Sequence, residues 1–263
     1  MMWWQAVLLG LLQGLTEFLP VSSSGHLALA QAMIPGFHQP GVVFDAMLHV
    51  GTAFAVVWAE RRQLARWLTS VAGWRLIGLL VLGTAATGIL GFPFRHAAES
   101  AFTHPGWVGL FLLLTGLIVL GTRFLPGGSR GETETGWRDA LGVGFLQGLA
   151  VFPGLSRSGT TIAAGLGVGL DRTWAARFSF LLSVPAIAAA TLLEVVGARG
   201  EVAGLGFSFW LACLLGGVTA AVSGYFALRV VIRTVTSKSF HRFAAYCLPL
   251  GAVVVTLHLL GVL

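Results

Sequence analysis

The sequence predicts an all-α polytopic membrane protein, in which six transmembrane helices and two re-entrant helical hairpins form an inverted repeat. The first observation is composition: of 263 residues, 56% are hydrophobic and 10% are charged, whereas soluble domains carry roughly 25% charged residues. The second observation is a set of six apolar segments long enough to cross a bilayer. The third is a pair of shorter apolar regions, each interrupted by polar residues, whose sequences match each other.

The six expected spans follow from length and hydropathy. A helix needs about 20 predominantly apolar residues to cross the hydrocarbon core, and the segments that meet this requirement are 43–59, 75–93, 106–124, 178–197, 207–228 and 243–262. The residues before the first apolar stretch lack the positive charge of a signal peptide, so we expect that stretch to stay in the mature protein. Cys213 and Cys247 lie in apolar stretches without the spacing of a zinc site or a disulfide framework.

Two apolar regions are too short to span. Residues 3–18 and 25–34 flank the polar stretch FLPVSSSGH, and residues 140–152 and 159–170 flank FPGLSRSG. Twelve helical residues rise only about 18 Å, against a hydrocarbon core of about 30 Å. Each pair is therefore predicted to form a re-entrant hairpin, whose broken tip is tolerated at membrane depth only where protein or a water-filled cavity surrounds it.

The two broken regions are copies of each other. GLLQGLTEFLPVSSSG (10–25) and GFLQGLAVFPGLSRSG (144–159) align without a gap at an offset of 134 residues, with nine of sixteen positions identical. The same offset carries FDAMLHVG (44–51) onto FSFLLSVP (178–185). The chain therefore contains an internal duplication.

The duplication predicts one membrane domain over residues 1–263, built from repeats 1–125 and 137–263. Each repeat begins with its hairpin, at 3–34 or 140–170, and continues with three spans. Because three is an odd number, the second repeat starts on the opposite side of the membrane and is inverted. Inverted repeats with broken helices bring their polar tips together near the midplane.

The distribution of basic residues gives an independent orientation. With the 60–74 loop taken as cytoplasmic, thirteen Lys and Arg residues fall on the inside and only Arg95 and Arg199 on the outside, as the positive-inside rule requires. Both termini and the opening of the first hairpin are thus expected on the outer face. Although the net charge is +6, the basic residues form no patch with aromatics, so we expect no nucleic-acid partner.

The second polar tip has the residues of a phosphate cradle. Arg157 offers a planar fork that matches phosphoryl oxygens. Glycines allow backbone N–H groups to approach an anion, and the helix that follows would direct its positive end at the tip. The candidate phosphate-binding residues of this tip, besides Arg157, are Gly154, Ser156, Ser158, Thr160 and Thr161.

The first polar tip has the residues of a reactive site. Gln13 and Glu17 are four residues apart, so a helix places both on one face, where they could hold a divalent cation or orient a base. Pro20 ends that half-helix. A serine near a histidine and a carboxylate is the arrangement of an activated nucleophile, and the candidates are Ser22, Ser23, Ser24 and His26.

Structural roles compete with each of these assignments. Glu17 and Arg157 could simply form an ion pair that locks the hairpins, although this leaves the hydroxyl cluster and His26 without a purpose. Asp45 and His49 could line the mouth of a cavity or lie at the interface. Glu194 is better explained by helix packing or snorkelling.

The two tips together resemble a known family. QGLTEFLPVSSSGH and PGLSRSGTT are similar to the paired signature of the undecaprenyl-diphosphate phosphatases of the bacitracin-resistance type, and the resemblance extends over nearly the whole chain. It implies an enzyme of the bacterial inner membrane that converts undecaprenyl diphosphate to undecaprenyl phosphate and inorganic phosphate, for recycling of the peptidoglycan carrier lipid. Its implied catalytic residues are Glu17, Ser23, His26 and Arg157. Ser156 and Thr161 also match family site positions.

The resemblance also implies a divalent cation, Mg²⁺ or Ca²⁺. Gln13 stands where the family signature has its first acid, so we expect the cation to bridge to the diphosphate more than to be caged by Gln13 and Glu17. The expected mechanism is attack by Ser23, with His26 taking its proton and Glu17 orienting the imidazole or the metal. Attack by His26 itself, or by water, stays open, as do prenyl chain length and metal identity. A homodimer is a further expectation.

Two alternatives compete with this function. Lipid phosphatases of the acid-phosphatase type need a histidine six residues after the arginine, where Ala163 stands. A polyprenyl-phosphate flippase or another transporter would share the inverted-repeat architecture, because a fold does not fix a function. The serine, histidine and carboxylate opposite an arginine favour hydrolysis.

Overall fold

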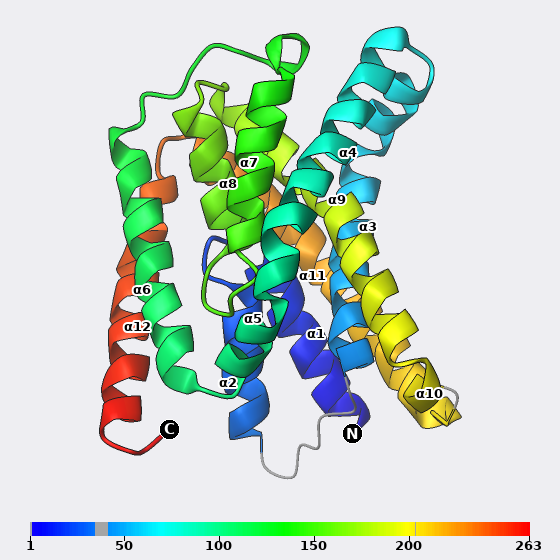
Figure 1. Cartoon of the computed structure of the whole chain (residues 1–263), viewed down its shortest axis with the longest axis vertical. Helices are drawn as coiled ribbons and strands as arrows, with labels where there is room; N and C mark the ends of the chain where they lie inside the picture. The colour runs from blue at the N-terminus through cyan, green and yellow to red at the C-terminus, as the bar shows by residue number, and fades with distance from the viewer. Residues whose placement is uncertain (1, 35–41, 203) are drawn as a thin grey trace.

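The computed structural model describes residues 2–34, 42–202 and 204–263, and in these ranges the chain is a bundle of helices. Among the described residues, six helical segments are long and apolar enough to cross a membrane, which confirms the number of spans expected from hydropathy. Both termini lie at the same end of the bundle (Figure 1). The long helices are α3 (Val42–Leu68), α4 (Val71–Gly91), α6 (Pro105–Gly121), α9 (Arg172–Gly197), α11 (Phe207–Thr236) and α12 (Ala244–Leu259). Adjoining 3₁₀ turns lengthen α6 and α12 to candidate spans of 20 residues each, Pro105–Phe124 and Phe240–Leu259.

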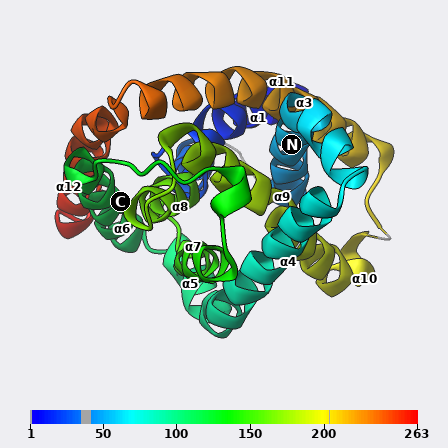
Figure 2. The same cartoon turned by 90° about the horizontal axis from the view of Figure 1, so that it is seen from above.

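Four half-helices lie among these spans. They are α1 (Trp3–Phe18), α2 (Ser23–Met33), α7 (Trp137–Leu149) and α8 (Arg157–Gly167). None exceeds 16 residues, so each rises at most about 24 Å, which is consistent with re-entrant hairpins. The first pair rises from the end that carries the termini and the second descends from the other end (Figure 1). Seen from above, α7 lies on the rim between α4 and α6 (Figure 2).

Short helices fill the connections. The segment expected as an outer loop after α4 continues as a 3₁₀ turn and an amphipathic helix. The short elements are η1 (Phe92–Phe94), α5 (Arg95–Phe102), η2 (Thr122–Phe124), η3 (Glu132–Glu134), α10 (Arg199–Val202) and η4 (Phe240–Phe243).

The helix α3 continues nine residues beyond the predicted span, to Leu68. Its polar last turns are held by the loop before α7, where the Glu132 carboxylate accepts hydrogen bonds from Gln63 Nε2 at 2.8 Å and from Trp67 Nε1 at 2.6 Å. The prediction ended this span at residue 59, because hydropathy measures only how well a residue is tolerated in hydrocarbon. The helix continues to Leu68 because hydrogen bonds to the loop before α7 stabilise its polar last turns.

The same loop secures the start of α7. Arg130 makes two 2.9 Å hydrogen bonds to the Asp139 carboxylate, which also accepts the Gly136 N–H at 2.8 Å. Burial raises the pKa of Asp139, but the bonds from Arg130 and the Gly136 N–H outweigh it and hold that pKa below its ordinary value. Asp139 therefore stays ionised near the positive end of α7, where an anion is favourable.

The first helix of each hairpin packs on a span of the other half of the chain. Helix α1 packs on α11, and α7 packs on α4. A Cβ at Gly10 would come within 2.3 Å of Gly216 O, and one at Gly144 within 2.2 Å of Gly83 O. Gly10 and Gly144 are separated by the 134-residue offset of the sequence repeat. Small residues let helix backbones approach closely inside a membrane.

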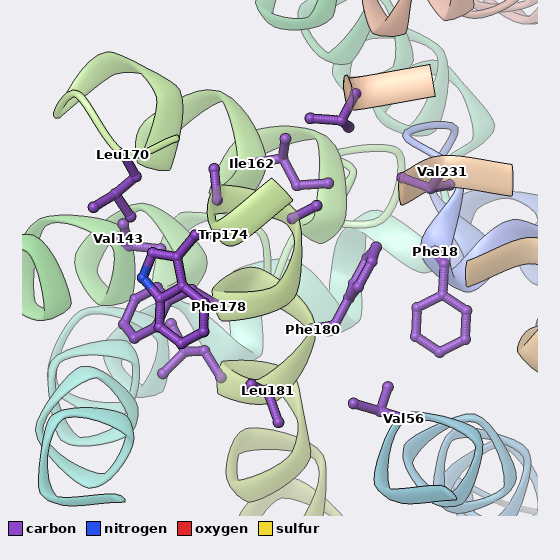
Figure 3. Close-up of a cluster of buried hydrophobic side chains, with 14 of the residues drawn as sticks. Phe18, Val56, Val143, Ile162, Leu170, Trp174, Phe178, Phe180, Leu181 and Val231 are labelled. Atoms are coloured by element: carbon purple, nitrogen blue, oxygen red, sulfur yellow. The ribbon is translucent and has the colours of Figure 1, made fainter. Parts of the chain in front are cut away.

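One apolar cluster joins the hairpins to the spans. Phe18, at the end of α1, is fully buried and meets Phe180 of α9 edge to face, with ring centroids 5.3 Å apart. Ile162 of α8 and Val231 of α11 belong to the same cluster, and Figure 3 shows Phe18 beside Phe180. The tip of the first hairpin is thus fixed by packing from three other helices.

The close contact at Gly14 gives a stability prediction. In Gly14→Ala the added methyl group would lie 2.0 Å from Ser223 Oγ and 2.5 Å from Ala220 O. We therefore expect the free energy of unfolding to fall by about 1–3 kcal/mol. Gly88→Ala is the matched control, because a Cβ there meets nothing within 4 Å and alanine favours a helix. Thermal unfolding of both variants in one detergent, followed by tryptophan fluorescence, tests this. Equal midpoints would contradict the close packing of α1 on α11.

Candidate active site

The tip of the first hairpin is a tight turn capped by serine. Helix α1 ends at Phe18, and Ser22 has a φ of +67°, in the left-handed region. Its Oγ caps α2 by accepting the Gly25 N–H at 3.3 Å. The predicted start of this half-helix at residue 25 was therefore two residues late, because the serine cap allows the helix to begin at Ser23.

The tip of the second hairpin has the same design. Ser156 caps α8, its Oγ accepting the Gly159 N–H at 3.1 Å. Gly154 has a φ of +98°, which a side chain would disfavour. Thr115 of α6 holds the turn from outside, donating to Gly154 O and accepting the Ser156 N–H, both at 2.8 Å.

The two tips contact each other directly. The Gly154 N–H donates to Ser22 Oγ at 3.0 Å, and Ser158 Oγ donates to Leu19 O at 3.1 Å. Helix α12 closes one side, where buried Cys247 donates its thiol to Pro20 O at 3.2 Å. Residues that are more than 130 positions apart in the sequence thus form one polar centre.

The Glu17 carboxylate lies at this centre and is 6% exposed. Its Oε1 accepts a short hydrogen bond from Arg157 Nη2. Its Oε2 accepts from Ser23 Oγ at 2.5 Å and from Gln13 Nε2 at 2.8 Å. The imidazole of His49, on α3, approaches Oε2 to 3.7 Å. Both carboxylate oxygens therefore have cationic or hydroxyl partners.

His26 makes different contacts from those expected. Its Nδ1 is 2.8 Å from Ser22 O, and its Nε2 is 2.7 Å from Tyr246 OH on α12. Because a carbonyl only accepts, Nδ1 carries the hydrogen and Nε2 accepts from the tyrosine. The two rings also stack, with centroids 5.7 Å apart. The structure therefore pairs Ser23 with Glu17, in place of the expected transfer from Ser23 to His26.

Two buried donors at the centre have no hydrogen-bond partner among the described residues. They are Arg157 Nη1 and Thr160 Oγ1. Arg157 is the first residue of α8, so its free N–H groups lie beside the positive end of that helix. Unpaired buried donors are rare and costly. Their position beside a guanidinium and a helix N-terminus favours an oxyanion such as phosphate as the missing partner.

Most of the other candidate hydroxyls form hydrogen bonds within the two tips. Ser22 and Ser156 cap helices, Ser158 bonds to Leu19 O, and Ser24 Oγ lies 3.3 Å from Ser22 Oγ. Thr161 Oγ1 lies 2.5 Å from Ser179 Oγ and donates to Arg157 O at 2.8 Å. These side chains maintain the shape of the tips. Ser23 Oγ instead bonds to Glu17, and Arg157 Nη1 and Thr160 Oγ1 have no hydrogen-bond partner among the described residues.

His49 and Tyr246 complete the site from distant helices. His49 reaches Glu17, whereas Asp45, one turn earlier, accepts from Gln31 Nε2 at 2.8 Å. The interval of four residues between Asp45 and His49 was a weak signal for this position. Tyr246 gave no sequence signal, because an isolated tyrosine near the end of a span has the pattern of an interfacial anchor.

The residues present do not form a cage for a metal ion. Among the described residues no group of three or more His, Cys, Asp or Glu side chains could hold one. Gln13 directs its amide nitrogen at Glu17, and both Glu17 oxygens already accept hydrogen bonds. Gln13 Oε1 is buried without a hydrogen-bond partner among the described residues, so this pair offers a cation one free oxygen, from an amide, and no free carboxylate oxygen.

Comparison with known proteins agrees with the two-tip motif. The family model described as "Bacitracin resistance protein BacA" matches residues 6–253. A protein of Desulfatibacillum aliphaticivorans named undecaprenyl-diphosphatase is 40% identical, over 97% of this chain and 98% of its own length. Proteins of the same name from Desulfosudis oleivorans and Methanosphaera stadtmanae are 44% and 36% identical, over 95% and 96% of this chain and 96% of each relative.

The serine caps generate a second prediction. Ser22→Ala removes the acceptor of both the Gly25 and the Gly154 N–H groups, so we expect a loss of about 1–3 kcal/mol in stability. Ser24→Ala is the matched control, because the one hydrogen bond of its hydroxyl among the described residues is 3.3 Å long. The unfolding midpoint of each variant in detergent measures the difference. If Ser24→Ala lowered the unfolding midpoint as much as Ser22→Ala, the hydrogen bonds to Ser22 Oγ would not be the contacts that hold the two tips together.

Proposed function

Because the chain belongs to the BacA family of bacitracin resistance proteins, we propose that it is an undecaprenyl-diphosphatase. It removes the terminal phosphate of undecaprenyl diphosphate and leaves undecaprenyl phosphate and inorganic phosphate. This reaction recycles the carrier lipid for peptidoglycan synthesis and supports bacitracin resistance. The name of the curated relatives supports the substrate.

One observation carries this proposal. A serine donates a hydrogen bond to a carboxylate, and the arginine bonded to the other carboxylate oxygen has a buried N–H group without a partner among the described residues. Ser23 Oγ donates to Glu17 Oε2 at 2.5 Å, while Arg157 holds the other oxygen and keeps Nη1 unpaired. A phosphoryl group bound by Arg157 Nη1 and Thr160 Oγ1 would be adjacent to Ser23. The nucleophile Ser23, the proton acceptor Glu17 and the charge stabiliser Arg157 would then surround the phosphoryl group.

The first chemical step is an in-line attack. Ser23 Oγ forms a bond to the terminal phosphorus, the bond from that phosphorus to the bridging oxygen breaks, and undecaprenyl phosphate leaves with the electron pair. Glu17 accepts the serine proton. Binding of the diphosphate draws Arg157 away from the carboxylate and brings negative charge close, and both changes make Glu17 a better proton acceptor. Arg157 stabilises the charge that develops on the transferred phosphoryl oxygens.

The second step restores the serine. Water attacks phosphorus, the Ser23 Oγ–P bond breaks, and inorganic phosphate leaves as the serine recovers its proton. His26 as nucleophile would require its Nε2 to leave Tyr246. We therefore assign His26 a supporting role at the wall of the site and Ser23 the covalent role.

A divalent cation, Mg²⁺ or Ca²⁺, is part of the proposal as a component of the substrate. It would neutralise the diphosphate oxygens and arrive with them, because Gln13 and Glu17 form no cage. No step above depends on a protein ligand to the ion.

We propose the orientation given by the basic residues, with both termini and the opening of the site on the outer face of the inner membrane. A homodimer is compatible with this arrangement. A polyprenyl-phosphate flippase remains the second candidate, since oppositely inserted hairpins are also transporter architecture. Release of phosphate separates the two functions.

Arg157→Ala tests the function. Detergent-purified protein is expected to release inorganic phosphate from a prenyl diphosphate, and Arg157→Ala should lower kcat/KM about 10³-fold or more because charge stabilisation is lost. Arg123→Ala, at an exposed position, is the matched control and should retain activity. Binding of the lipid without phosphate release by the unmodified protein would favour the flippase.

Ser23→Ala tests the nucleophile. We expect a fall in kcat of about three orders of magnitude, as for other covalent nucleophiles. Tyr246→Phe removes one hydrogen bond of about 1 kcal/mol, so kcat should fall by about tenfold at most. Near-complete activity in Ser23→Ala together with a loss of about three orders of magnitude in His26→Ala would transfer the covalent role to His26.

A further inference from the structure

An apolar groove lies between α3 and α11, on the side of these helices that faces away from the site. Its volume is about 440 Å³, within the range of small-molecule sites. Phe54, Trp58, Val222 and Phe226 expose more than half of their surface along it. Six of its lining residues are Phe54, Ala55 and Trp58 from α3 and Val222, Tyr225 and Phe226 from α11.

Each wall of the groove ends in an arginine stacked on an aromatic ring. The Arg61 guanidinium lies 4.5 Å from the centroid of Trp58, and the Arg229 guanidinium lies 4.5 Å from that of Tyr225. Arg61 Nη1 also donates to Trp58 O at 2.7 Å, and Arg229 Nη2 donates to Tyr225 OH. These contacts fix the planes of both guanidinium groups and leave most of their five N–H donors facing outward.

The two arginines lie beyond the same end of the groove. Arg61 follows Trp58 by three positions and Arg229 follows Tyr225 by four, so each lies about one helical turn beyond an aromatic residue of the groove lining. Helices α3 and α11 pack against each other, with Gly51 against Gly217 O. From the arginines the groove leads toward residues 54 and 222, that is, toward the middle of the spans. A charged head and an apolar chain would follow the same direction.

We propose that this groove binds an anionic phospholipid of the leaflet at the arginine-rich end of the bundle. The phosphate of the lipid would lie between Arg61 and Arg229, and one acyl chain would run along the groove toward the midplane. Basic positions between transmembrane helices recognise anionic headgroups by this combination of charge and depth. Isolated snorkelling arginines would have no reason to stack on aromatic residues of one and the same groove.

A second copy of the chain fits this face less well. In a two-fold contact the same patch meets itself, so the arginines of one copy would approach those of the other. A concave surface would also face a concave surface. The charge and the shape of the groove both favour a lipid.

The groove is connected to the site through its floor. Ala55 is 2% exposed and belongs to the apolar cluster that contains Phe18, next to Glu17. Gly224 of α11 also approaches Phe18, because a Cβ there would lie 3.0 Å from its Cε2. A lipid in the groove would therefore stabilise the two helices that support α1. This proposal does not depend on the reaction that the site performs.

The test compares lipid binding by the full-length protein in neutral detergent. Native mass spectrometry and thermal unfolding are measured with phosphatidylglycerol and with phosphatidylcholine of the same acyl chains. We expect phosphatidylglycerol to bind and to raise the unfolding midpoint. The double variant Arg61→Gln/Arg229→Gln should lose about thirtyfold in affinity for it, the effect of removing two arginines near an anionic headgroup.

The control is Arg62→Gln/Arg123→Gln, which removes the same charge from two exposed arginines. Unlike Arg61 and Arg229, neither of them stacks on an aromatic residue of the groove among the described residues, so this variant should bind as the unmodified protein does. Unchanged midpoints without lipid and unchanged phosphate release show that both double variants are folded. Equal affinities of the two double variants would overturn the proposal. A change in oligomeric mass of Arg61→Gln/Arg229→Gln, with its lipid affinity intact, would assign the groove to a subunit contact and overturn it as well.

Discussion

The pairing of Glu17 with Arg157 is the constraint on which the rest of the structure depends. The side chain of Glu17 is 5% exposed and that of Arg157 is 16% exposed, and a charge left alone at membrane depth is costly. They belong to different hairpins, so neither hairpin can be placed without the other. The glycine contacts of α1 and α7, the serine caps and the Phe18 cluster all bring the two tips to one point. Disturbing any of them separates the charges.

The sequence was sufficient for the number of spans and for the partners of this pair. Hydropathy defined six spans and two broken regions because membrane length is a strict criterion, and the expectation that the two polar tips face each other brought Glu17 to Arg157. It was insufficient for the directions of side chains in the tips. The left-handed Ser22 turns the start of α2 so that Ser23 meets Glu17 and His26 meets Tyr246. The spacing of residues along a helix does not show how the Ser22 turn orients the start of α2. The contacts of Tyr246 and His49 arise from packing between helices that are distant in the sequence, which spacing does not show either.

Most hydroxyls in the two tips serve the backbone. Ser22 and Ser156 cap helices, and Ser158 and Thr161 join neighbouring elements. A polar group at membrane depth must be satisfied within the protein, so a broken helix needs these residues whatever its function. The reactive set that we propose is consequently smaller than composition suggested. It consists of Ser23, Glu17 and Arg157, which bond to one another, and of Thr160, whose hydroxyl has no partner among the described residues.

Helix polarity explains why these groups lie at a meeting of two half-helices. Glu17 is in the last turn of α1, at its negative end, and Arg157 is the first residue of α8, at its positive end. Each charge is disfavoured by its own helix by about 0.3–1 kcal/mol, and each is compensated by the other. An arriving oxyanion is attracted by both Arg157 and the positive end of α8. Glu17 then loses part of its interaction with Arg157 while it stays beside the negative end of α1, and both conditions favour its accepting a proton. An unbroken helix could not place a positive and a negative helix end at one depth, so the interruption of the two hairpins creates the acid–base difference on which the proposed mechanism depends.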